Sequence, residues 1–432
     1  MDYQQSRAYV SDADRYAGGA LDLTNIKELM KRLGNPQDQL KYVHVAGTNG
    51  KGSVIAYLYT TLSEAGYRVG RYISPSVYSY REKMEVAGRS VSREQFAGYV
   101  TRVAAAIEEM TSEGLAHPTP FEIETAVAFL FFAEENCDLV ILEVGMGGNL
   151  DATNIIKNTI LAVLVPISMD HQSFLGNTLS EIAEKKAGII KPGCSVVTTG
   201  QQPETMAVIK NVCAQNNADL TEADLREAKA VKEDFAGQIL EYRGETFELS
   251  LAGSYQTENA ALALEALHVL EKKGYPTTVL QRKKGLKDTR WNGRLTIIHR
   301  DPLFIVDGAH NPAAADMLED SVRKYFKGRK MFFIMGVFRD KDYSYIIRKL
   351  CPYAQQIVTV ETPNNPRALP AGELAEAIKP CNQHVQAANS IEDAVNKVFD
   401  MAGCNDVILS FGSLSFIGQI TAIVKTREEK NS

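Results

Sequence analysis

A glycine-rich segment between two apolar stretches constrains this chain more than any other feature of its sequence. The segment VHVAGTNGKGSV, residues 43–54, places Gly47, Gly50, Lys51 and Gly52 directly after an apolar run. A loop of this kind between a buried strand and a helix lets backbone N–H groups surround an anion, and the amino end of the helix adds its dipole. The sequence therefore predicts an α/β unit with a phosphate-binding loop.

The polar residues of this segment favour a phosphate loop over a simple turn. Lys51 would add a full positive charge, and the Ser53 hydroxyl would hold Mg²⁺. The spacing departs from G-x-x-x-x-G-K-[ST], because Val45 stands at the first glycine position and Gly52 follows the lysine. A plain strand–turn–helix connection also needs glycine for positive φ, but it has no use for the neighbouring Thr, Asn, Lys and Ser.

Strand-like and helix-like patterns alternate along the chain, which is typical of parallel α/β folds. We expect strands at residues 42–46, 71–74, 139–144 and 159–166, and helices at 53–65, 92–110, 122–134, 179–187 and 254–272. Residues 219–250 alternate in short charged runs and predict antiparallel β-structure.

The pattern restarts after Gly293, with expected strands at residues 303–306, 330–335, 356–360 and 406–410. A chain of 432 residues is too long for one core. We therefore predict a two-domain α/β protein. An N-terminal P-loop ATPase-like domain with a parallel sheet would cover residues 1–293, and a smaller C-terminal Rossmann-like domain would cover residues 294–432.

Composition and charge bound the partners and the compartment. The formal net charge of -6 argues against a general nucleic-acid binder. The N-terminal stretch lacks the apolar core of a secretory signal, and the longest apolar run, residues 126–133, is too short for a bilayer span. The six cysteines are scattered without a C-x-x-C pair, so free thiols and a cytoplasmic location are expected.

Polar residues follow several of the predicted strands, where parallel sheets bind ligands. Ser74 ends one strand, and Glu143 lies inside another, where burial is costly unless the acid is paired or metal-bound. A Glu at a frayed strand end, facing water, is the alternative. His171 is either a metal ligand or a satisfied buried histidine. Composition alone leaves Lys186 a solvated charge near a helix end.

A second polar cluster, DGAHNP at residues 307–312, follows a strand of the second half. No G-x-S-x-G or Cys/His dyad signature is present in the sequence. From the residues alone, we predict a two-domain, Mg²⁺-dependent nucleotide enzyme whose substrate stays open.

Six motifs in order resemble a known family. They are VAGTNGKGS, SP-x5-RE, GMGGNLDATN, the segment from Asp170 to Lys191 that contains KAGIIK, RWNGRL and DGAHNP. Together they resemble the folylpolyglutamate synthase and dihydrofolate synthase family of the Mur ligase superfamily, over about residues 29–418.

The resemblance implies an ATP-dependent amide ligase. ATP would phosphorylate a substrate carboxylate to an acyl phosphate, and the amine of L-glutamate would attack it. The acceptor would be folate, with dihydropteroate as a second substrate in bifunctional members. Two Mg²⁺ sites, a monovalent cation such as K⁺ and a monomeric state are further implications, with no nucleic-acid or membrane partner.

The resemblance also assigns roles to residues of this chain, beyond those of the phosphate loop. Its ATP contacts fall on Gly47, Thr48, Asn49, Gly50, Lys51, Gly52, Ser53, Asn259, Arg294 and Asp307. Its metal ligands fall on Ser53, Ser74, Glu143, His171 and a carbamylated Lys186. Its substrate contacts fall on Arg81, Phe121, Asp151, Ala152 and Ser413, and its catalytic positions are Lys51, Lys186, His171 and His310.

Two departures from the family pattern bear on substrate preference. Asn149 stands where the family often has arginine, and Ser76 where it often has histidine. Two other readings stay open: a Mur-type amino-acid ligase with a different carboxylate acceptor, and a binding or regulatory ATPase. The GMGGNLDATN and TPFE segments favour the folate branch, and the DGAHNP cluster argues against a pure switch.

Overall fold

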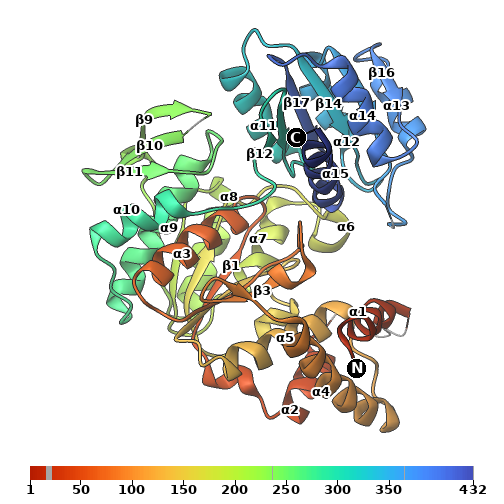
Figure 1. Ribbon diagram of the computed structural model, residues 1–432. Helices are drawn as coiled ribbons and strands as arrows, with labels where there is room; N and C mark the ends of the chain where they lie inside the picture. Colours follow the sequence, from red (N-terminus) through yellow and green to blue (C-terminus); the bar gives the residue numbers. More distant parts are fainter. Residues whose placement is uncertain (16–21, 236, 364, 432) are drawn as a thin grey trace. The chain divides into compact units, whose positions relative to one another are not determined.

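The computed structural model describes residues 1–15, 22–235, 237–363 and 365–431 (Figure 1). The chain forms two compact α/β units. The first comprises Met1–Ser76, Tyr80–Ala228 and Glu258–Asp288, and the second comprises Val77–Ser79, Lys229–Thr257 and Thr289–Ser432. The predicted two-domain α/β class is confirmed.

An eight-stranded sheet in the order β4-β3-β2-β5-β1-β6-β7-β8 forms the centre of the first unit. Its strands are β1 Tyr42–Ala46, β2 Val69–Tyr72, β3 Met84–Val86, β4 Arg89–Ser90, β5 Leu139–Glu143, β6 Thr159–Leu164, β7 Ser195–Thr198 and β8 Asp219–Glu222. All neighbouring pairs are parallel except β2–β3 and β3–β4. The carboxyl ends of β1, β5 and β6 therefore lie at one edge, which is where the predicted loops start.

Helices cover both faces of this sheet. They are α1 Tyr3–Asp12, α2 Thr24–Arg32, α3 Lys51–Glu64, α4 Arg93–Ser112, α5 Pro120–Glu134, α6 Gln172–Leu175, α7 Leu179–Ala187, α8 Pro203–Gln215, α9 Gln256–Lys272 and α10 Val279–Asp288. On one face, Tyr42 and Leu142 pack against α4 and α5, and Ala162 and Val196 pack against α7 and α8. Helix α3 contacts β1, β2 and β5 and pairs with α10 (Figure 1).

Local sequence signals start four of these helices. Helices α1, α4, α5 and α7 begin with capping boxes, which are formed by Asp2 with Gln5, Ser92 with Gln95, Thr119 with Glu122, and Thr178 with Glu181. The TPFE segment is thus a helix start, in which Pro120 occupies the first turn, where its missing N–H costs no hydrogen bond.

The second unit is built on a six-stranded sheet in the order β12-β13-β17-β14-β15-β16. Its strands are β12 Thr296–His299, β13 Leu303–Val306, β14 Met331–Met335, β15 Gln356–Thr359, β16 Val385–Ala387 and β17 Val407–Phe411. Its helices are α11 Pro312–Tyr325, α12 Tyr343–Leu350, α13 Ala371–Ile378, α14 Ile391–Met401 and α15 Ile417–Asn431. Along β14, Phe333 faces α11 and α12 while Phe332 faces α14 and α15. Burial on both faces explains why the strand is apolar at every position.

A separate three-stranded antiparallel sheet also belongs to the second unit. It consists of β9 Lys229–Asp234, β10 Gly237–Tyr242 and β11 Glu245–Leu249. Phe235 packs against Phe326, with ring centroids 5.1 Å apart, and the Tyr325 hydroxyl donates to Glu233 at 3.1 Å. Residues 229–257 therefore belong to the second compact unit. The expected boundary at residues 293/294 divides the chain by sequence order and places the same residues in the N-terminal domain.

Most expected elements form where the sequence indicates, within a few residues. One part of the β prediction was wrong: β8, inside the segment expected to be antiparallel, pairs parallel with β7 and extends the large sheet. Its register with β7 is set by tertiary packing, which a four-residue polar strand does not encode. The antiparallel remainder of that segment, β9 to β11, is confirmed.

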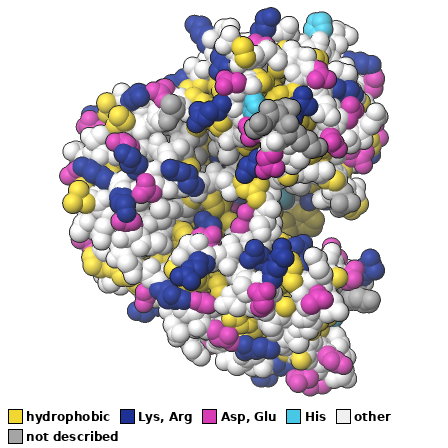
Figure 2. All heavy atoms as spheres, viewed as in Figure 1, with side chains coloured by type: hydrophobic (Ala, Val, Ile, Leu, Met, Phe, Trp, Pro, Cys, Tyr) yellow, Lys and Arg dark blue, Asp and Glu magenta, His cyan; other side chains and the backbone are white. Residues whose placement is uncertain are grey.

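The thiols agree with the expectation from the sequence. Basic and acidic side chains are interspersed on the face drawn in Figure 2. All six cysteines are free. Within the described residues, the helices are too short or too polar to cross a bilayer.

Candidate functional site

The loop after β1 lies against β6 so closely that Gly47 has no room for a side chain. Gly47 has φ 140°, and a Cβ there would lie 2.2 Å from Val165 Cγ2 and 2.7 Å from the Val165 carbonyl oxygen. Thr48 ties the loop to the segment after β6, because its hydroxyl donates to Ser168 O at 3.1 Å and accepts from Ser168 N at 3.0 Å. The predicted ATP contact Thr48 therefore also positions the loop.

Helix α3 starts at this loop without a side-chain cap in the described structure. Its N-cap is Gly50, with φ 98°, whereas α4, α5 and α7 have capping boxes. The first N–H groups of a helix need acceptors, and here a bound anion would supply them. Lys51 Nζ lies 3.4 Å from Gly47 O and 3.3 Å from Thr48 O.

Three further residues of the predicted set lie in or beside this loop. A Cβ on Gly50 would lie 2.5 Å from Asn259 Oδ1, which places the start of α9 beside the loop. Asn49 lies in the turn before α3, and Gly52 lies in the first turn of α3. The predicted ATP contacts of the first unit therefore come together around one helix start.

Glu143 lies at the carboxyl end of β5, beside this loop. It is 7% exposed, so the alternative of a water-facing acid is wrong. Its Oε1 lies 3.9 Å from Lys51 Nζ, and its Oε2 accepts from Ser74 N at 3.1 Å. Ser53 lies in the first turn of α3 and is only 2% exposed.

These oxygen groups fit a magnesium ion. Hydroxyl and carboxylate oxygens are ligands that Mg²⁺ prefers, and nucleotide sites often use one carboxylate with substrate phosphates. Within the described residues, no group of three or more His, Cys, Asp and Glu side chains is arranged to hold a metal. The donor set around Glu143 thus suits an ion shared with a phosphate better than an all-protein cage.

Lys186 is buried, which corrects the interpretation from composition. Its side chain follows Ile182 by one helical turn on the inner face of α7, is 6% exposed, and donates from Nζ to Gly47 O at 2.9 Å. Burial, with a contribution from Lys51, lowers the pKa of Lys186 to about 7. As an ammonium group it cannot coordinate a cation, so its predicted metal role requires modification.

His171 begins the short helix α6, with φ 51°. Its backbone N–H donates to Asp170 Oδ1 at 2.8 Å, and its Nε2 lies 3.9 Å from Asp170 Oδ2. Asp170 is also close enough to Lys186 to oppose the lowering of that lysine's pKa. Asp170, which the sequence prediction omitted, therefore interacts with two predicted metal residues.

Three predicted substrate residues of the first unit, Phe121, Asp151 and Ala152, lie around the loop after β5. The Phe121 ring stacks on Tyr72 with centroids 6.0 Å apart, and it is half-buried. Asp151 and Ala152, each 6% exposed, lie in the same loop and at the start of the 3₁₀ helix Ala152–Ile155. The loop is pressed onto α7, because a Cβ on Gly148 would lie 2.6 Å from Lys185 O.

A buried hydrogen-bond chain, missed from the sequence, holds Asp151. His44 Nε2 lies 2.8 Å from Thr153 Oγ1, and this hydroxyl lies 2.6 Å from Asp151 Oδ1. Asp151 also accepts from the backbone N–H groups of Thr153 at 3.0 Å and Met146 at 2.9 Å. Because a carboxylate only accepts, Thr153 donates to Asp151 and His44 donates to Thr153. A histidine inside the apolar strand VHVA was the available signal.

Burial sets the charge states of His44 and Asp151 in these hydrogen bonds. It lowers the pKa of His44 to about 3 and raises that of Asp151, while hydrogen bonds from Thr153 and Met146 oppose the second shift. His44 is therefore neutral near pH 7. Its Nδ1 has no hydrogen-bond partner among the described residues, which fits a lone pair better than an N–H.

The remaining predicted residues lie in other segments of the sequence than the loops after β1 and β5. Arg81, in the first unit, donates to Val91 O at 3.0 Å. In the second unit, Asp307 accepts from Leu295 N at 2.9 Å and Ala309 N at 2.8 Å, and burial raises its pKa while Arg294 opposes the rise.

The loops after β13 and β17 adjoin in the second unit. Gly412 N donates to Ala309 O at 3.0 Å. His310 Nδ1 lies 2.8 Å from Gly308 O, and Ser413 Oγ lies 2.6 Å from Ser415 Oγ. Arg294, Asp307, His310 and Ser413 are therefore grouped at the carboxyl ends of these strands.

We predict that Gly47→Ala lowers the free energy of unfolding by about 2 kcal/mol and abolishes Mg·ATP binding, because the new methyl group meets Val165 in a strained backbone conformation. Gly98→Ala is the matched control, since Gly98 lies exposed in α4 with open space around it and should gain up to about 1 kcal/mol. Urea unfolding and calorimetric titration with Mg·ATP measure both effects. Unchanged ATP binding in Gly47→Ala would contradict the close approach.

We predict that lowering the pH from about 6 to about 4 reduces the free energy of unfolding of the wild type more than that of His44→Gln. The extra loss should be about 1.4 kcal/mol per pH unit. The folded state resists protonation of His44, so its contribution is present above about pH 6.5 and is lost as the pH falls toward about 3. Urea unfolding across this range measures the difference. Thr153→Val, which breaks the chain but keeps the titrating group, should retain the slope, and parallel curves for wild type and His44→Gln would contradict it.

Comparison with known proteins identifies the family. Residues 45–267 match the Mur ligase middle domain, and residues 293–414 match the Mur ligase, glutamate ligase domain. A dihydrofolate synthase/folylpolyglutamate synthase of Bacillus subtilis is 34% identical over 98% of this chain and 99% of its own. A Mycobacterium tuberculosis folylpolyglutamate synthase solved with ADP and AMPPCP is 30% identical, with a TM-score of 0.87 over 98% of this chain and 99% of its own. An FPGS–AMPPCP–folate complex has a TM-score of 0.82 at 29% identity, over 99% and 100% of the two chains. The chain belongs to the folylpolyglutamate synthase and dihydrofolate synthase family of the Mur ligase superfamily.

Proposed function

We propose that this protein is an ATP-dependent ligase that adds L-glutamate to the γ-carboxylate of a reduced folate, and to dihydropteroate as a second acceptor. The acceptor carboxylate attacks the γ-phosphorus of ATP, and ADP leaves. The glutamate amine then attacks the acyl phosphate, the amide C–N bond forms, and phosphate leaves with loss of one amine proton. The uncapped start of α3, with Lys51 beside Gly47 and Glu143, is the observation that carries this proposal.

The chain's own groups supply positioning and charge in the first step. N–H groups of the α3 start and the Lys51 ammonium would bind the phosphates and stabilise the charge that moves onto the leaving ADP. The loop cannot shift away from the phosphates without separating Gly47 from Val165 and Lys186. Phosphoryl transfer needs this type of support more than a side-chain nucleophile.

We propose that Ser53, Ser74 and Glu143 hold one Mg²⁺, and that His171 and a modified Lys186 hold a second. When bound, Mg²⁺ neutralises phosphate oxygens and orients the nucleotide. The carboxylate of Glu143, which is buried and whose Oε1 lies 3.9 Å from Lys51 Nζ, supports the first assignment. A monovalent cation such as K⁺ stays a proposal that rests on the family alone.

We propose that Phe121, Asp151 and Ala152 hold the flat ring of the acceptor. The support is the half-buried Phe121 ring beside a loop fixed by Asp151. Arg294 and Asp307 as ATP contacts, and Arg81, His310 and Ser413 as groups that handle glutamate or the acyl phosphate, are also proposals. So are the functional division at residues 293/294, a monomeric state and a cytoplasmic location.

Phosphate release by purified protein with Mg·ATP and L-glutamate tests the function. We expect release with tetrahydrofolate and with dihydropteroate, and none with a UDP-sugar peptide, the acceptor of the alternative Mur-type reading. Lys51→Ala should lower kcat by at least about 100-fold, because it removes a charge that stabilises the transition state. Phosphate release with the UDP-sugar peptide alone would show that the acceptor is not a folate. Full activity of Lys51→Ala would contradict the assignment of the loop after β1 as the phosphate-binding loop.

We further propose that the Lys186 Nζ is carbamylated. The neutral amine would attack CO₂, an N–C bond would form and one proton would leave to solvent, which turns a cation into an anionic oxygen ligand. The ammonium is buried and donates to a carbonyl rather than to a carboxylate in the described structure. Its pKa near 7 leaves a substantial neutral fraction at physiological pH.

We predict that Lys186→Ala loses most activity and regains part of it with about 50 mM acetate, since a small carboxylate would replace the missing ligand. Lys185→Ala, which removes the neighbouring lysine on the same helix, should stay active without acetate. Initial rates of phosphate release with tetrahydrofolate measure both. Full activity of Lys186→Ala, or no response to acetate and formate, contradicts the carbamate.

A further inference from the structure

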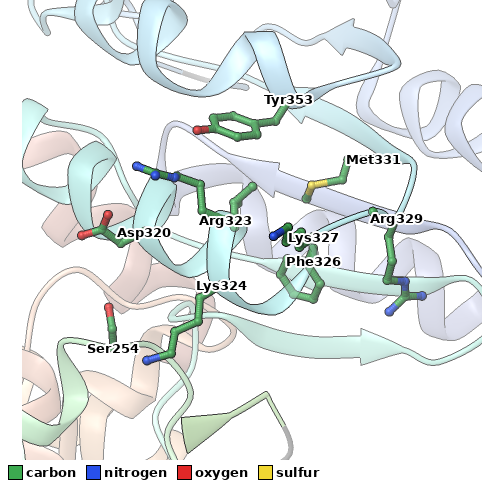
Figure 3. A pocket seen from close by; sticks show the side chains of 11 residues that line it. Ser254, Asp320, Arg323, Lys324, Phe326, Lys327, Arg329, Met331 and Tyr353 are labelled. Carbon is green, nitrogen blue, oxygen red and sulfur yellow. The ribbon is translucent and has the colours of Figure 1, made fainter.

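A cavity of about 780 Å³ lies in the second unit at the carboxyl end of α11 (Figure 3). Its walls come from the end of α11 and the following turn, the start of β14, Tyr353 and Ser254. Met331 is the first residue of β14, so the cavity lies at the amino edge of the sheet. Asp307 and Ser413 follow the carboxyl ends of β13 and β17. A five-residue strand separates the two edges by about 16 Å. The cavity is therefore separate from the strand-end cluster that contains Asp307 and Ser413.

The lining is strongly basic. Residues 323–330, RKYFKGRK, hold five cations and no acid, in a chain whose formal net charge is -6. Arg323, Lys324, Lys327 and Arg329 line the cavity, and Asp320 is the one acid among the lining residues. The helix dipole favours Arg323 and Lys324 in the last turn of α11. It does not account for Lys327, Arg329 and Lys330, which follow the helix.

Two of the lining cations have neither an ion pair nor a hydrogen bond with a described residue. Lys324 pairs with Glu233, and Arg329 donates to Asn405 O at 2.7 Å and Asp406 O at 3.1 Å. Arg323 and Lys327 are exposed and have no ion pair with any described residue. Clustered like charges repel one another, so an anion bound between them relieves a cost that the fold itself leaves uncompensated.

The remaining walls suit a ligand that is more than a simple ion. Phe326 and Met331, each 3% exposed, form an apolar floor, and the Tyr353 ring and the Ser254 hydroxyl complete the lining. The volume is that of sites that hold drug-sized ligands.

The arrangement favours spread carboxylates over a compact phosphate. The phosphate loop of the first unit uses backbone N–H groups at a helix start, whereas the helix end here presents carbonyl oxygens, which disfavour a concentrated negative charge. Long lysine and arginine side chains at separate positions match charges that recur along a chain.

We propose that this cavity binds a chain of closely spaced carboxylates, the γ-linked oligoglutamate tail of the ligase product. The choice of γ-glutamyl chain rests on the proposed function, and the preference for a polycarboxylate rests on the cavity. Products with longer tails would bind more tightly than a monoglutamate, because each added carboxylate reaches another cation. The enzyme would then retain its product outside the catalytic loops.

Fluorescence anisotropy of fluorescein-labelled penta-γ-L-glutamate, without ATP, tests this proposal. We expect binding to the full-length protein that weakens with added salt, and a Kd about tenfold higher in the double variant Arg323→Ser/Lys327→Ser. The matched control is Arg300→Ser/Lys425→Ser, which removes one exposed arginine and one exposed lysine elsewhere in the second unit. Its Kd should stay within about twofold of the wild type.

Three results would overturn the proposal: no binding of the peptide to the wild type, equal loss in both double variants, or tighter competition by inorganic triphosphate than by penta-γ-L-glutamate. Phosphate release separates this test from the function itself. Both double variants should keep the wild-type kcat with tetrahydrofolate, because neither touches the catalytic loops. A wild type that releases no phosphate with any pteridine defeats the proposed function, whatever the peptide does.

Discussion

The contact between Gly47 and Val165 is the constraint on which the site of the first unit depends. Since no side chain fits between them, the loop after β1 stays against the end of β6. Its carbonyl groups then face Lys51 and Lys186, and the start of α3 keeps its N–H groups uncovered by any side-chain cap that the structure describes. This steric contact thus arranges both the cations and the uncapped end of the helix that we propose binds phosphate.

Buried carboxylates fix the loops at both predicted strand-end clusters. Asp151 accepts backbone N–H groups from Met146 and Thr153, and so clamps the loop after β5. Asp307 does the same for Leu295 and Ala309 in the second unit. A buried carboxylate that lost these donors would pay several kcal/mol in desolvation. Each acid therefore holds its loop in one shape, which suits a site that must position reactants.

The two edges of the second sheet differ in the way they present charge. The carboxyl edge groups a buried acid with Arg294 and a pair of serine hydroxyls, each engaged in specific hydrogen bonds. The amino edge presents exposed cations around an apolar floor. Defined hydrogen bonds suit chemistry at one point, whereas long cationic side chains suit a flexible polyanion.

The sequence by itself determined the alternation of strands and helices, the glycine-rich loop between β1 and α3, and the two α/β units, because these follow from local patterns of apolar, glycine and capping residues. It also indicated Glu143, since an acid in an apolar strand is a local signal. Only the tertiary structure decided that Lys186 is buried, that β8 pairs parallel with β7, and that His44 reaches Asp151 through Thr153. It likewise brought Ser254 beside the cations of residues 323–330. Burial, strand order and contacts across 109 residues, as between His44 and Thr153, depend on how distant segments pack, and no local pattern encodes that packing.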